Sequence, residues 1–526
     1  MSADDATSDQ LPSSAQKNAG LPRRRVLQGL AAAGLGGAAA IPLAGSARAA
    51  SSVDWAGFDR QVRSAFDQLR LVGSAVAVVS SDRVVHTLTL GSRTVQPRRP
   101  VTQQTRFRVG STTKSMTSAF VATYVDEKTL AWDQPVVDAW SGFRAPTDEL
   151  TRTLTVRQLL NMASGLGDPP GPDPHLGVPT PDEVVHGVAI LPVLTEPGTF
   201  FYNNTVNALG GYLPLLASGV ALGDLGAAYA NAVAERIFRP VGMTGARMAD
   251  DPRGLVDDYS DGHVFDLRAK AHTLPFGAIG AHAPAGAALA SVTDMASWVR
   301  MQLRQGLSVT GNRVVSAANL GECWKGGAAV PFSPNADPDA LSQQYGMGWQ
   351  RLTFTNGTVL IWHNGAIEGF TSYMGFLPQH DLGIVVVNNI NTAPTGIGFY
   401  LYVLNLLLNQ QLGLNMGVPA KALEFSDAGI AGLEQIGRQA RSVDFRAVAP
   451  YLGYYADGYA LAREGGELVL RITSRVMPLR AIPDGTYVIV GGLILGTRVK
   501  LARDADGTPH IEIVGVQTVR RTVGLE

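Results

Sequence analysis

Residues 107–114 read Phe-Arg-Val-Gly-Ser-Thr-Thr-Lys, a short apolar segment that runs directly into a helical pattern. Residues three apart share one face of a helix, so the hydroxyl of Ser111 and the amine of Lys114 can touch. At the helix N-terminus the macrodipole favours negative charge developing on Ser111. Burial would lower the pKa of Lys114, and its neutral amine could then accept the serine proton. The pair is a candidate nucleophile and base, although Ser14 and Lys17 have the same spacing in a polar N-terminal segment.

Two further polar motifs lie far along the chain. One is Tyr202-Asn203-Asn204. A tyrosine beside a lysine ammonium is acidified and can relay a proton, and Asn204 can hydrogen-bond both the lysine and a substrate carbonyl. The other is His363-Asn364-Gly365, which follows an apolar strand. Its glycine would let a substrate lie against the strand edge, and a backbone N–H just beyond it could complete an oxyanion hole with that of Ser111.

Hydrophobic periodicity predicts an α+β fold around these motifs. A hairpin is expected from residues 75–79 and 84–90, but two strands alone are marginally stable. We therefore expect one antiparallel sheet built from both ends of this region, with helices on its faces and an inserted helical region. The other expected strands cover residues 346–350, 359–362, 371–376 and 383–387. The expected helices cover residues 53–70, 112–126, 206–240 and 292–304, with an apolar helix after residue 395. A proline-rich connection over 164–200 is expected to line the site.

The last part of the chain changes character. Residues 413–445 read as a linker and a short helix, and turn signals then separate β-rich runs over residues 446–526. This spacing predicts a small barrel or sandwich of about 80 residues. It contains no candidate catalytic group, so deletion from about residue 430 is expected to leave the acylation chemistry in place.

Residues 1–49 read as an export signal. Arg23-Arg24-Arg25 precedes an uncharged Ala/Gly/Leu stretch, and Ala47-Arg48-Ala49 places small residues where a signal peptidase cuts. The pattern resembles a twin-arginine signal, which predicts a periplasmic or secreted protein. The alternative is an uncleaved N-terminal anchor. No later segment reads as a membrane span, so no transmembrane domain is expected in the mature protein.

Composition excludes several function classes. There are 43 basic and 44 acidic residues, a balance that argues against a nucleic-acid partner. The single cysteine, Cys323, rules out an internal disulfide framework and a cysteine-rich zinc site. The motifs of α/β-hydrolases and of zinc hydrolases are absent from the sequence. We expect no cofactor and no metal.

Taken in order, the three motifs resemble those of the serine β-lactamase and penicillin-binding protein superfamily. The likeness is to the class C-like branch and its D-alanyl-D-alanine carboxypeptidase-type relatives, which include D-aminopeptidases and esterases. It covers roughly residues 55–410, and residues 50–412 are expected to form the hydrolase domain. Residues 446–526 are similar to the lipocalin-like domain of many members.

The resemblance implies a role for each motif residue. Ser111 would be the acylated nucleophile, Lys114 and Tyr202 would share the base role, and Asn204 would orient lysine and substrate. His363 would replace the lysine of the third motif. Gly365 follows it in that motif, and Ala366 would supply the second oxyanion N–H beside that of Ser111.

The third motif departs from the usual Lys-Thr-Gly, because this chain has His-Asn-Gly. An unperturbed histidine is mostly neutral at pH 7 and offers a carboxylate a hydrogen bond but little charge. We therefore predict an exported serine hydrolase that forms an acyl-enzyme with a small ester, amide or D-amino-acid peptide. The alternatives are a class C-like β-lactamase and a peptidoglycan-binding sensor that acylates without turnover. The expected partner is a small-molecule or peptide substrate, and the C-terminal domain could support an oligomer.

Overall fold

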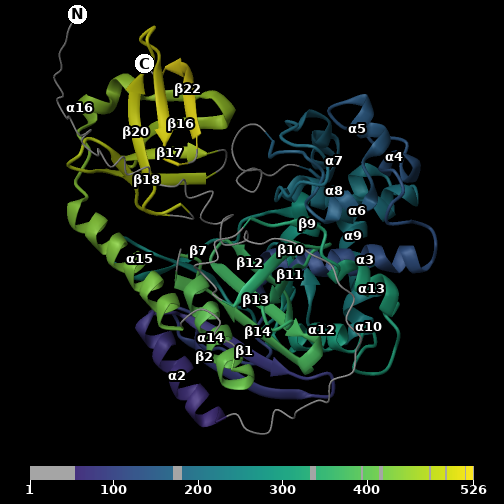
Figure 1. The fold of residues 1–526 in the computed structure, drawn as a ribbon. Coiled ribbons are helices and arrows are strands. Elements are labelled where there is room, and N and C mark those ends of the chain that lie inside the picture. The colour runs from purple at the N-terminus through teal and green to yellow at the C-terminus, as the bar shows by residue number, and fades with distance from the viewer. Residues whose placement is uncertain are drawn as a thin grey trace, which may run out of the picture.

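The computed structural model describes residues 54–169, 180–331, 339–392, 395–413, 419–472, 475–491, 494–515 and 517–524. It contains a nine-stranded antiparallel sheet flanked by helices and a closed eight-stranded barrel (Figure 1). Both parts of the predicted fold class are thereby confirmed. The predicted signal, residues 1–49, lies outside the described residues.

The large sheet joins strands from the two ends of residues 54–412. Its strands, in spatial order, are β3 (Arg99–Pro100), β2 (Val84–Thr94), β1 (Gly73–Val79), β14 (Leu382–Asn388), β13 (Phe370–Leu377), β12 (Val359–Ile367), β11 (Gln350–Phe354), β10 (Ala340–Tyr345) and β9 (Ala328–Ala329). β1 pairs antiparallel with β14, about 300 residues later, with Val76 opposite Val386. The early hairpin therefore completes a sheet made mostly of late strands, as the sequence predicts.

Each face of the sheet has its own hydrophobic core. Along β1, Ala75, Ala77 and Val79 pack into one core, whereas Val76 and Val78 pack into the other. This alternation follows from the two-residue period of a strand. Helices α2 (Trp55–Gln68), α14 (Thr395–Leu412) and α15 (Pro419–Gln439) cover the second core (Figure 1).

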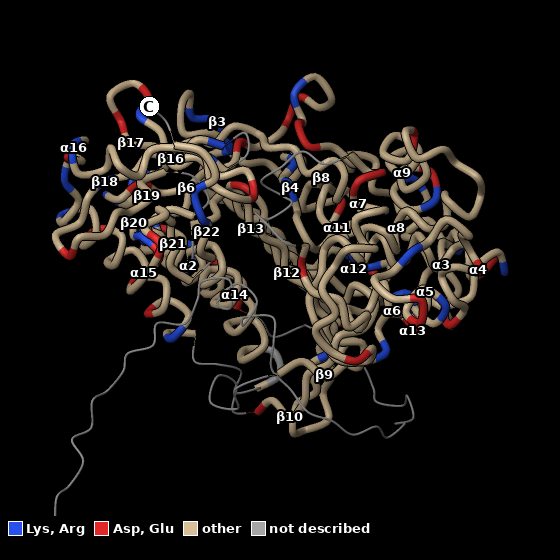
Figure 2. Tube along the Cα trace, turned by 90° about the horizontal axis from the view of Figure 1, so that it is seen from above, with Lys and Arg blue, Asp and Glu red and all other residues tan. Residues whose placement is uncertain are grey.

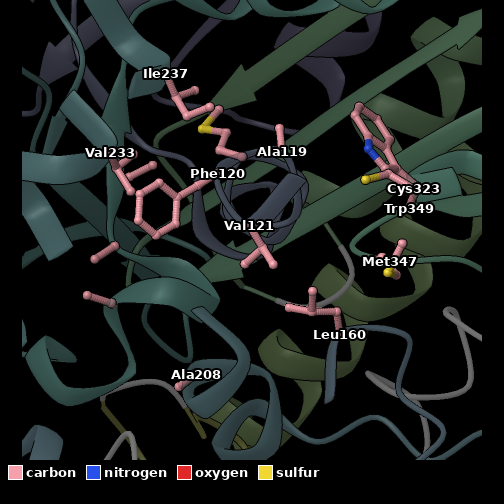
Figure 3. Packing of buried hydrophobic residues seen from close by; sticks show 14 of the residues in the cluster. Ala119, Phe120, Val121, Leu160, Ala208, Val233, Ile237, Cys323, Met347 and Trp349 are labelled. Atoms are coloured by element: carbon pink, nitrogen blue, oxygen red, sulfur yellow. The ribbon is translucent and has the colours of Figure 1, made fainter. Parts of the chain in front are cut away.

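The first core lies between the sheet and the inserted helical region. The helices on this side are α3 (Thr113–Asp126), α4 (Val136–Ala139), α5 (Asp148–Thr153), α6 (Val156–Leu160), α7 (Pro181–Gly187), α8 (Asn204–Ala217), α9 (Leu225–Val233), α10 (Arg239–Val241), α11 (Ala283–Gly286), α12 (Val292–Leu303) and α13 (Ala317–Trp324). α3 runs through the middle of this core and is buried on every side from Thr113 to Tyr124. Figure 3 shows Phe120 beside Val233, with Trp349 on the opposite side of the helix. The helix that carries Lys114 is thus held rigidly.

Two short sheets and one irregular segment complete this part. β4 (Phe107–Arg108), β8 (Ala288–Ala290) and β5 (Arg247–Met248) form one sheet, and β6 (Gly262–Phe265) pairs with β7 (Ala271–Leu274). The prediction of a strand over residues 346–350 is wrong for the first four, because residues 346–349 form a turn between β10 and β11, and β11 begins at Gln350. Gly348 has a φ of +70°, and a Cβ there would overlap the carbonyl oxygen of Lys114. The turn therefore packs directly on the start of α3.

The barrel follows α15 and the short helix α16 (Phe445–Val448). Its strands are β15 (Gly453–Tyr455), β16 (Tyr459–Glu464), β17 (Glu467–Ile472), β18 (Arg475–Ala481), β19 (Tyr487–Ile489), β20 (Arg498–Arg503), β21 (Pro509–Ile513) and β22 (Gln517–Gly524). β15 closes on β22, and inward side chains such as Leu461 and Leu470 form a separate core. The segment read as a linker with a short helix contains the 21-residue α15. The domain boundaries stay predictions.

Charges are distributed over the whole molecule. Figure 2 shows Lys and Arg interspersed with Asp and Glu on both the barrel and the helical side. Among the described helices, none alone has the length and hydropathy of a membrane span, and only α8 taken with residues 222–241, bent by 118°, passes that test. The described residues contain no group of three or more His, Cys, Asp or Glu side chains placed to hold a metal ion.

Candidate active site

The turn that carries the candidate nucleophile Ser111 connects β4 to α3, and we call it the nucleophile turn. Gly110–Thr112 form a single 3₁₀ turn, and α3 begins at Thr113. The turn is closed by its own threonines: Thr112 Oγ1 donates to Val109 O at 2.9 Å, and Thr113 Oγ1 donates to Gly110 O at 2.6 Å. These bonds fix the turn, and Ser111 lies half-buried within it, directly before a buried helix.

Lys114 is completely buried and reaches three oxygen atoms. Its Nζ lies 3.2 Å from Ser111 Oγ, 2.7 Å from Asn204 Oδ1 and 2.8 Å from the carbonyl oxygen of Ala285. Asn204 Oδ1 and Ala285 O can only accept, so they take two N–H groups of the amine. Burial lowers the pKa of Lys114 well below its ordinary value. In the neutral amine, the remaining lone pair faces the hydroxyl of Ser111.

Tyr202 lies close to both Ser111 and Lys114. The Ser111 side chain lowers the pKa of the Tyr202 phenol, and Lys114 Nζ lies 4.9 Å from the centre of the tyrosine ring. The expectation that a lysine ammonium acidifies Tyr202 is wrong. Burial raises the pKa of Tyr202, and the influence of Ser111 offsets this only in part. Because burial also disfavours the charged form of Lys114, no fixed cation lies beside the phenol.

The two asparagines after Tyr202 have different tasks. Asn203 caps α8, since its Oδ1 accepts from Val206 N at 2.8 Å and its Nδ2 donates to Gly167 O. Asn204 is the one that contacts Lys114. Tyr202 and Asn204, two residues apart, thus both lie beside Lys114, as the resemblance implied.

The third motif lies on an open strand edge. β11 pairs with β12 only from Val359 to Trp362, so His363–Ile367 have a strand partner on one side alone, β13. The other edge faces the nucleophile turn: a Cβ placed on Gly110 would lie 3.0 Å from Ala366 N. Ala366 itself is exposed. The backbone N–H groups of Ser111 and Ala366 thus belong to two adjacent segments, the arrangement that an oxyanion hole requires.

Gly365 has a packing role. A Cβ at this position would overlap Val109 O, which also accepts a hydrogen bond from Ser372 Oγ at 2.6 Å. The glycine lets β12 lie directly against the nucleophile turn. That it also leaves room for substrate at the strand edge stays a prediction.

We expect Gly365→Ala to cut acylation of Ser111 severely. The added methyl group must separate β12 from the nucleophile turn, and a misplacement of about 1 Å can cost on the order of 10²-fold in rate. Single-turnover acylation and thermal unfolding measured together are the test. Gly357→Ala, in an open turn between β11 and β12 but with a φ of +81°, is a control for backbone strain without the overlap. Equal acylation by the two variants would contradict the packing role.

His363 is neutral and has no hydrogen-bonding nitrogen left for a ligand. Its side chain is 1% exposed. Nδ1 lies 2.5 Å from the carbonyl oxygen of Asn364, which can only accept, so Nδ1 carries the proton. Nε2, 2.9 Å from the Tyr345 hydroxyl, must then accept from it. Burial, with a smaller contribution from Lys114, lowers the pKa of His363 to about 3. The expected loss of positive charge is present, but the expected hydrogen bond to a substrate carboxylate is not available.

Three contributors were not recognised in the sequence. Ala285 acts through a backbone carbonyl, which no side-chain pattern reveals. Tyr345 fixes His363, and Gly348 admits the turn that packs on Lys114, yet both lay in or beside a stretch read as a strand. The glycine pair of Gly346-Met347-Gly348 is the signal that favours a turn there.

Comparison with known proteins identifies the family. A family model described as Beta-lactamase matches residues 58–402. The chain belongs to the beta-lactamase family. Unguisins hydrolase ungD' of Aspergillus campestris is 26% identical over 353 residues, which are 64% of this chain and 61% of that protein. Penicillin-binding protein 4 of Amycolatopsis lactamdurans is 26% identical over 379 residues, 70% and 95% of the two chains. The chain spans about three fifths of the first relative's length.

Solved structures share the fold. The octameric penicillin-binding protein homologue from Pyrococcus abyssi superposes with a TM-score of 0.58 at 19% identity, covering 89% of this chain and all of that one. SurE, solved with D-Leu, gives a TM-score of 0.53 at 21% identity, covering 89% and 99%. At these identities the likeness concerns the fold alone.

Proposed function

We propose that this protein is a serine hydrolase that forms an acyl-enzyme at Ser111. Neutral Lys114 accepts the hydroxyl proton while Ser111 Oγ attacks the substrate carbonyl, whose oxygen takes the negative charge in the hole made by the N–H groups of Ser111 and Ala366. The carbonyl then re-forms as the bond to the leaving group breaks. Tyr202, which lies beside Ser111 and Lys114, passes the proton from Lys114 to the leaving group.

Deacylation reverses these roles with water as the nucleophile. Lys114 and Tyr202 remove a proton from the attacking water, and Ser111 leaves with the proton returned to it. Asn204 keeps the lysine lone pair directed at the reacting oxygen, because its Oδ1 holds one of the N–H groups. No group outside this set is required for the cycle.

The substrate we propose is a small ester, amide or D-amino-acid peptide. The observation that carries this choice is His363, which is buried, neutral and hydrogen-bonded through both ring nitrogens. It cannot attract the carboxylate of a β-lactam, an attraction that near a protein surface could be worth roughly a few kcal/mol. A relative named as a hydrolase of unguisins supports a substrate other than a β-lactam.

A side-by-side assay of one purified sample tests the substrate class. We expect p-nitrophenyl butyrate or a D-alanyl p-nitroanilide to be turned over far faster than nitrocefin. His363→Asn, which keeps the site uncharged, should leave this order unchanged. Nitrocefin turnover at a kcat/KM within the usual enzymatic range of about 10⁴–10⁸ M⁻¹s⁻¹ would make β-lactamase the right assignment. One product equivalent per enzyme with all three compounds would favour the sensor alternative.

We also propose that the protein is exported through its twin-arginine-type signal. Arg23→Lys with Arg24→Lys should strand the precursor in the cytoplasm, because the export receptor reads that arginine pair. The exported wild type should begin at Ala50. Arg48→Lys, outside the pair, is the matched control. N-terminal sequencing of exported protein that starts at residue 2 would support the anchor instead.

A further inference from the structure

Four charged side chains meet beside the candidate active site, and we refer to them as the charge cluster: Arg108, Asp250, Glu368 and Arg475. Arg108 is 1% exposed, and its Nη2 lies 3.7 Å from Asp250 Oδ1. Glu368 is 5% exposed and forms an ion pair with Arg475. Arg108 also interacts electrostatically with Glu368 and Arg475. Two cations and two anions balance, as buried charges must.

Two members of the cluster sit on segments that build the site, and a third holds another such segment. Arg108 ends β4, three residues before Ser111. Glu368 is the first residue of the two-residue turn after β12, two positions past the oxyanion residue Ala366. Asp250 accepts from the backbone N–H groups of Ile279 and Gly280, each at 3.0 Å. The cluster therefore joins three parts of the site: the nucleophile turn, the segment over residues 275–285, and β12, which carries Ala366 and which we call the oxyanion strand.

The last of these segments delivers the acceptor that orients Lys114. Near the start of this segment, Phe276 stacks on Phe370 of β13. A Cβ placed on the next residue, Gly277, would overlap both the Glu368 carboxylate and the Arg475 guanidinium. Eight residues after Gly277 comes Ala285, whose carbonyl oxygen accepts from Lys114 Nζ. The Glu368–Arg475 ion pair thus forms the surface on which this segment rests.

Arg475 comes from the barrel, as the first residue of β18. Its partner Glu368 is buried, and burial raises the pKa of that carboxyl against the opposing effects of Arg475 and Arg108. Without Arg475 the cluster would carry one positive and two negative charges. An uncompensated buried charge is strongly destabilising, and the turn after β12 or the 275–285 segment must then move to let water reach Glu368.

We propose that Arg475 is a positioning residue by which the C-terminal barrel holds the oxyanion strand and the Lys114 acceptor in place for acylation. Arg475 acts through Glu368 and does not touch the reacting atoms. The proposal rests on acylation of Ser111, as set out above. It reverses the expectation that the barrel is dispensable for the chemistry.

The test compares full-length variants. Arg475→Ala is expected to slow single-turnover acylation by p-nitrophenyl butyrate by on the order of 10²-fold, since small displacements of catalytic groups have effects of that size. Millimolar guanidinium, supplied in place of the missing side chain, should restore much of the rate without changing the wild type. The double variant Arg475→Ala with Glu368→Gln, which removes both charges, should acylate faster than Arg475→Ala alone.

Arg471→Ala is the matched control, because Arg471 forms its ion pair with Glu464 inside the barrel. It should acylate like the wild type. If Arg475→Ala is too unstable to purify, the double variant carries the test, and its acylation close to the wild-type rate supports the proposal. Acylation by Arg475→Ala within twofold of wild type, or a double variant no faster than Arg475→Ala alone, overturns it. Failure of the wild type itself to acylate at Ser111 would instead overturn the proposed function.

Discussion

Ser111→Ala should abolish turnover of every substrate. Loss of a serine nucleophile that acts with a base can cost on the order of 10⁶ in kcat. The hydroxyl is the group that Lys114 Nζ faces at 3.2 Å and that Tyr202 contacts, so no neighbouring oxygen can replace it in the same geometry. The measurement is steady-state hydrolysis of the best ester, together with labelling of the wild type by a fluorophosphonate and mass mapping of the modified peptide.

Ser118→Ala is a matched control on the same helix. Ser118 is buried in α3 and donates to the backbone carbonyl of Lys114 at 3.0 Å, without touching the lysine side chain. It should keep the activity and the labelling at Ser111. Residual activity of Ser111→Ala within tenfold of wild type, or probe attached to another serine, would exclude Ser111 as the nucleophile.

The parts of the site that the sequence predicted are those fixed by local geometry or by a motif. Ser111 and Lys114 meet because a helix places residues three apart on one face. Tyr202 and Asn204 come from a segment about 90 residues away, and only the family pattern connected them to Lys114. The antiparallel sheet was predictable from alternating burial, as along β1, where successive side chains enter different cores.

What the sequence could not predict depends on burial and on long-range contacts. The sign of the pKa shift of Tyr202 follows from the dehydration of the whole site, which residue types alone do not specify. The neutral state of His363 needs Tyr345, a partner on β10, and the exact tautomer needs the carbonyl of Asn364. The contribution of Arg475 requires knowing which strand of the barrel lies beside the turn after β12.

Lys114 and Tyr202 should behave as one proton-transfer unit. Lys114→Met and Tyr202→Phe are each expected to lower kcat by about 10²–10⁴-fold, the usual range for general acid–base groups. Both contact the same hydroxyl, so the double variant should lose far less than the product of the two single losses. Lys421→Met, an exposed lysine on α15, is the control and should be unaffected. Independent, multiplicative losses would show that the two side chains act on separate steps.

The pH profile separates this base from the other titratable groups of the site. Burial lowers the pKa of Lys114, and the deprotonated amine is the active form. The value of kcat/KM should therefore be high above that pKa and should fall as the pH drops through it. His363, with a pKa of about 3, contributes no limb between pH 5 and 8. Lys114→Met should remove the ascending limb, whereas His363→Asn should keep it. In the wild type at pH 7, Lys114 is protonated in the unfolded chain and must give up its proton and its hydration on folding. Lys114→Met avoids this cost, so the variant should be no less stable than wild type at that pH. A limb that survives in Lys114→Met and disappears in His363→Asn would assign the base to the histidine.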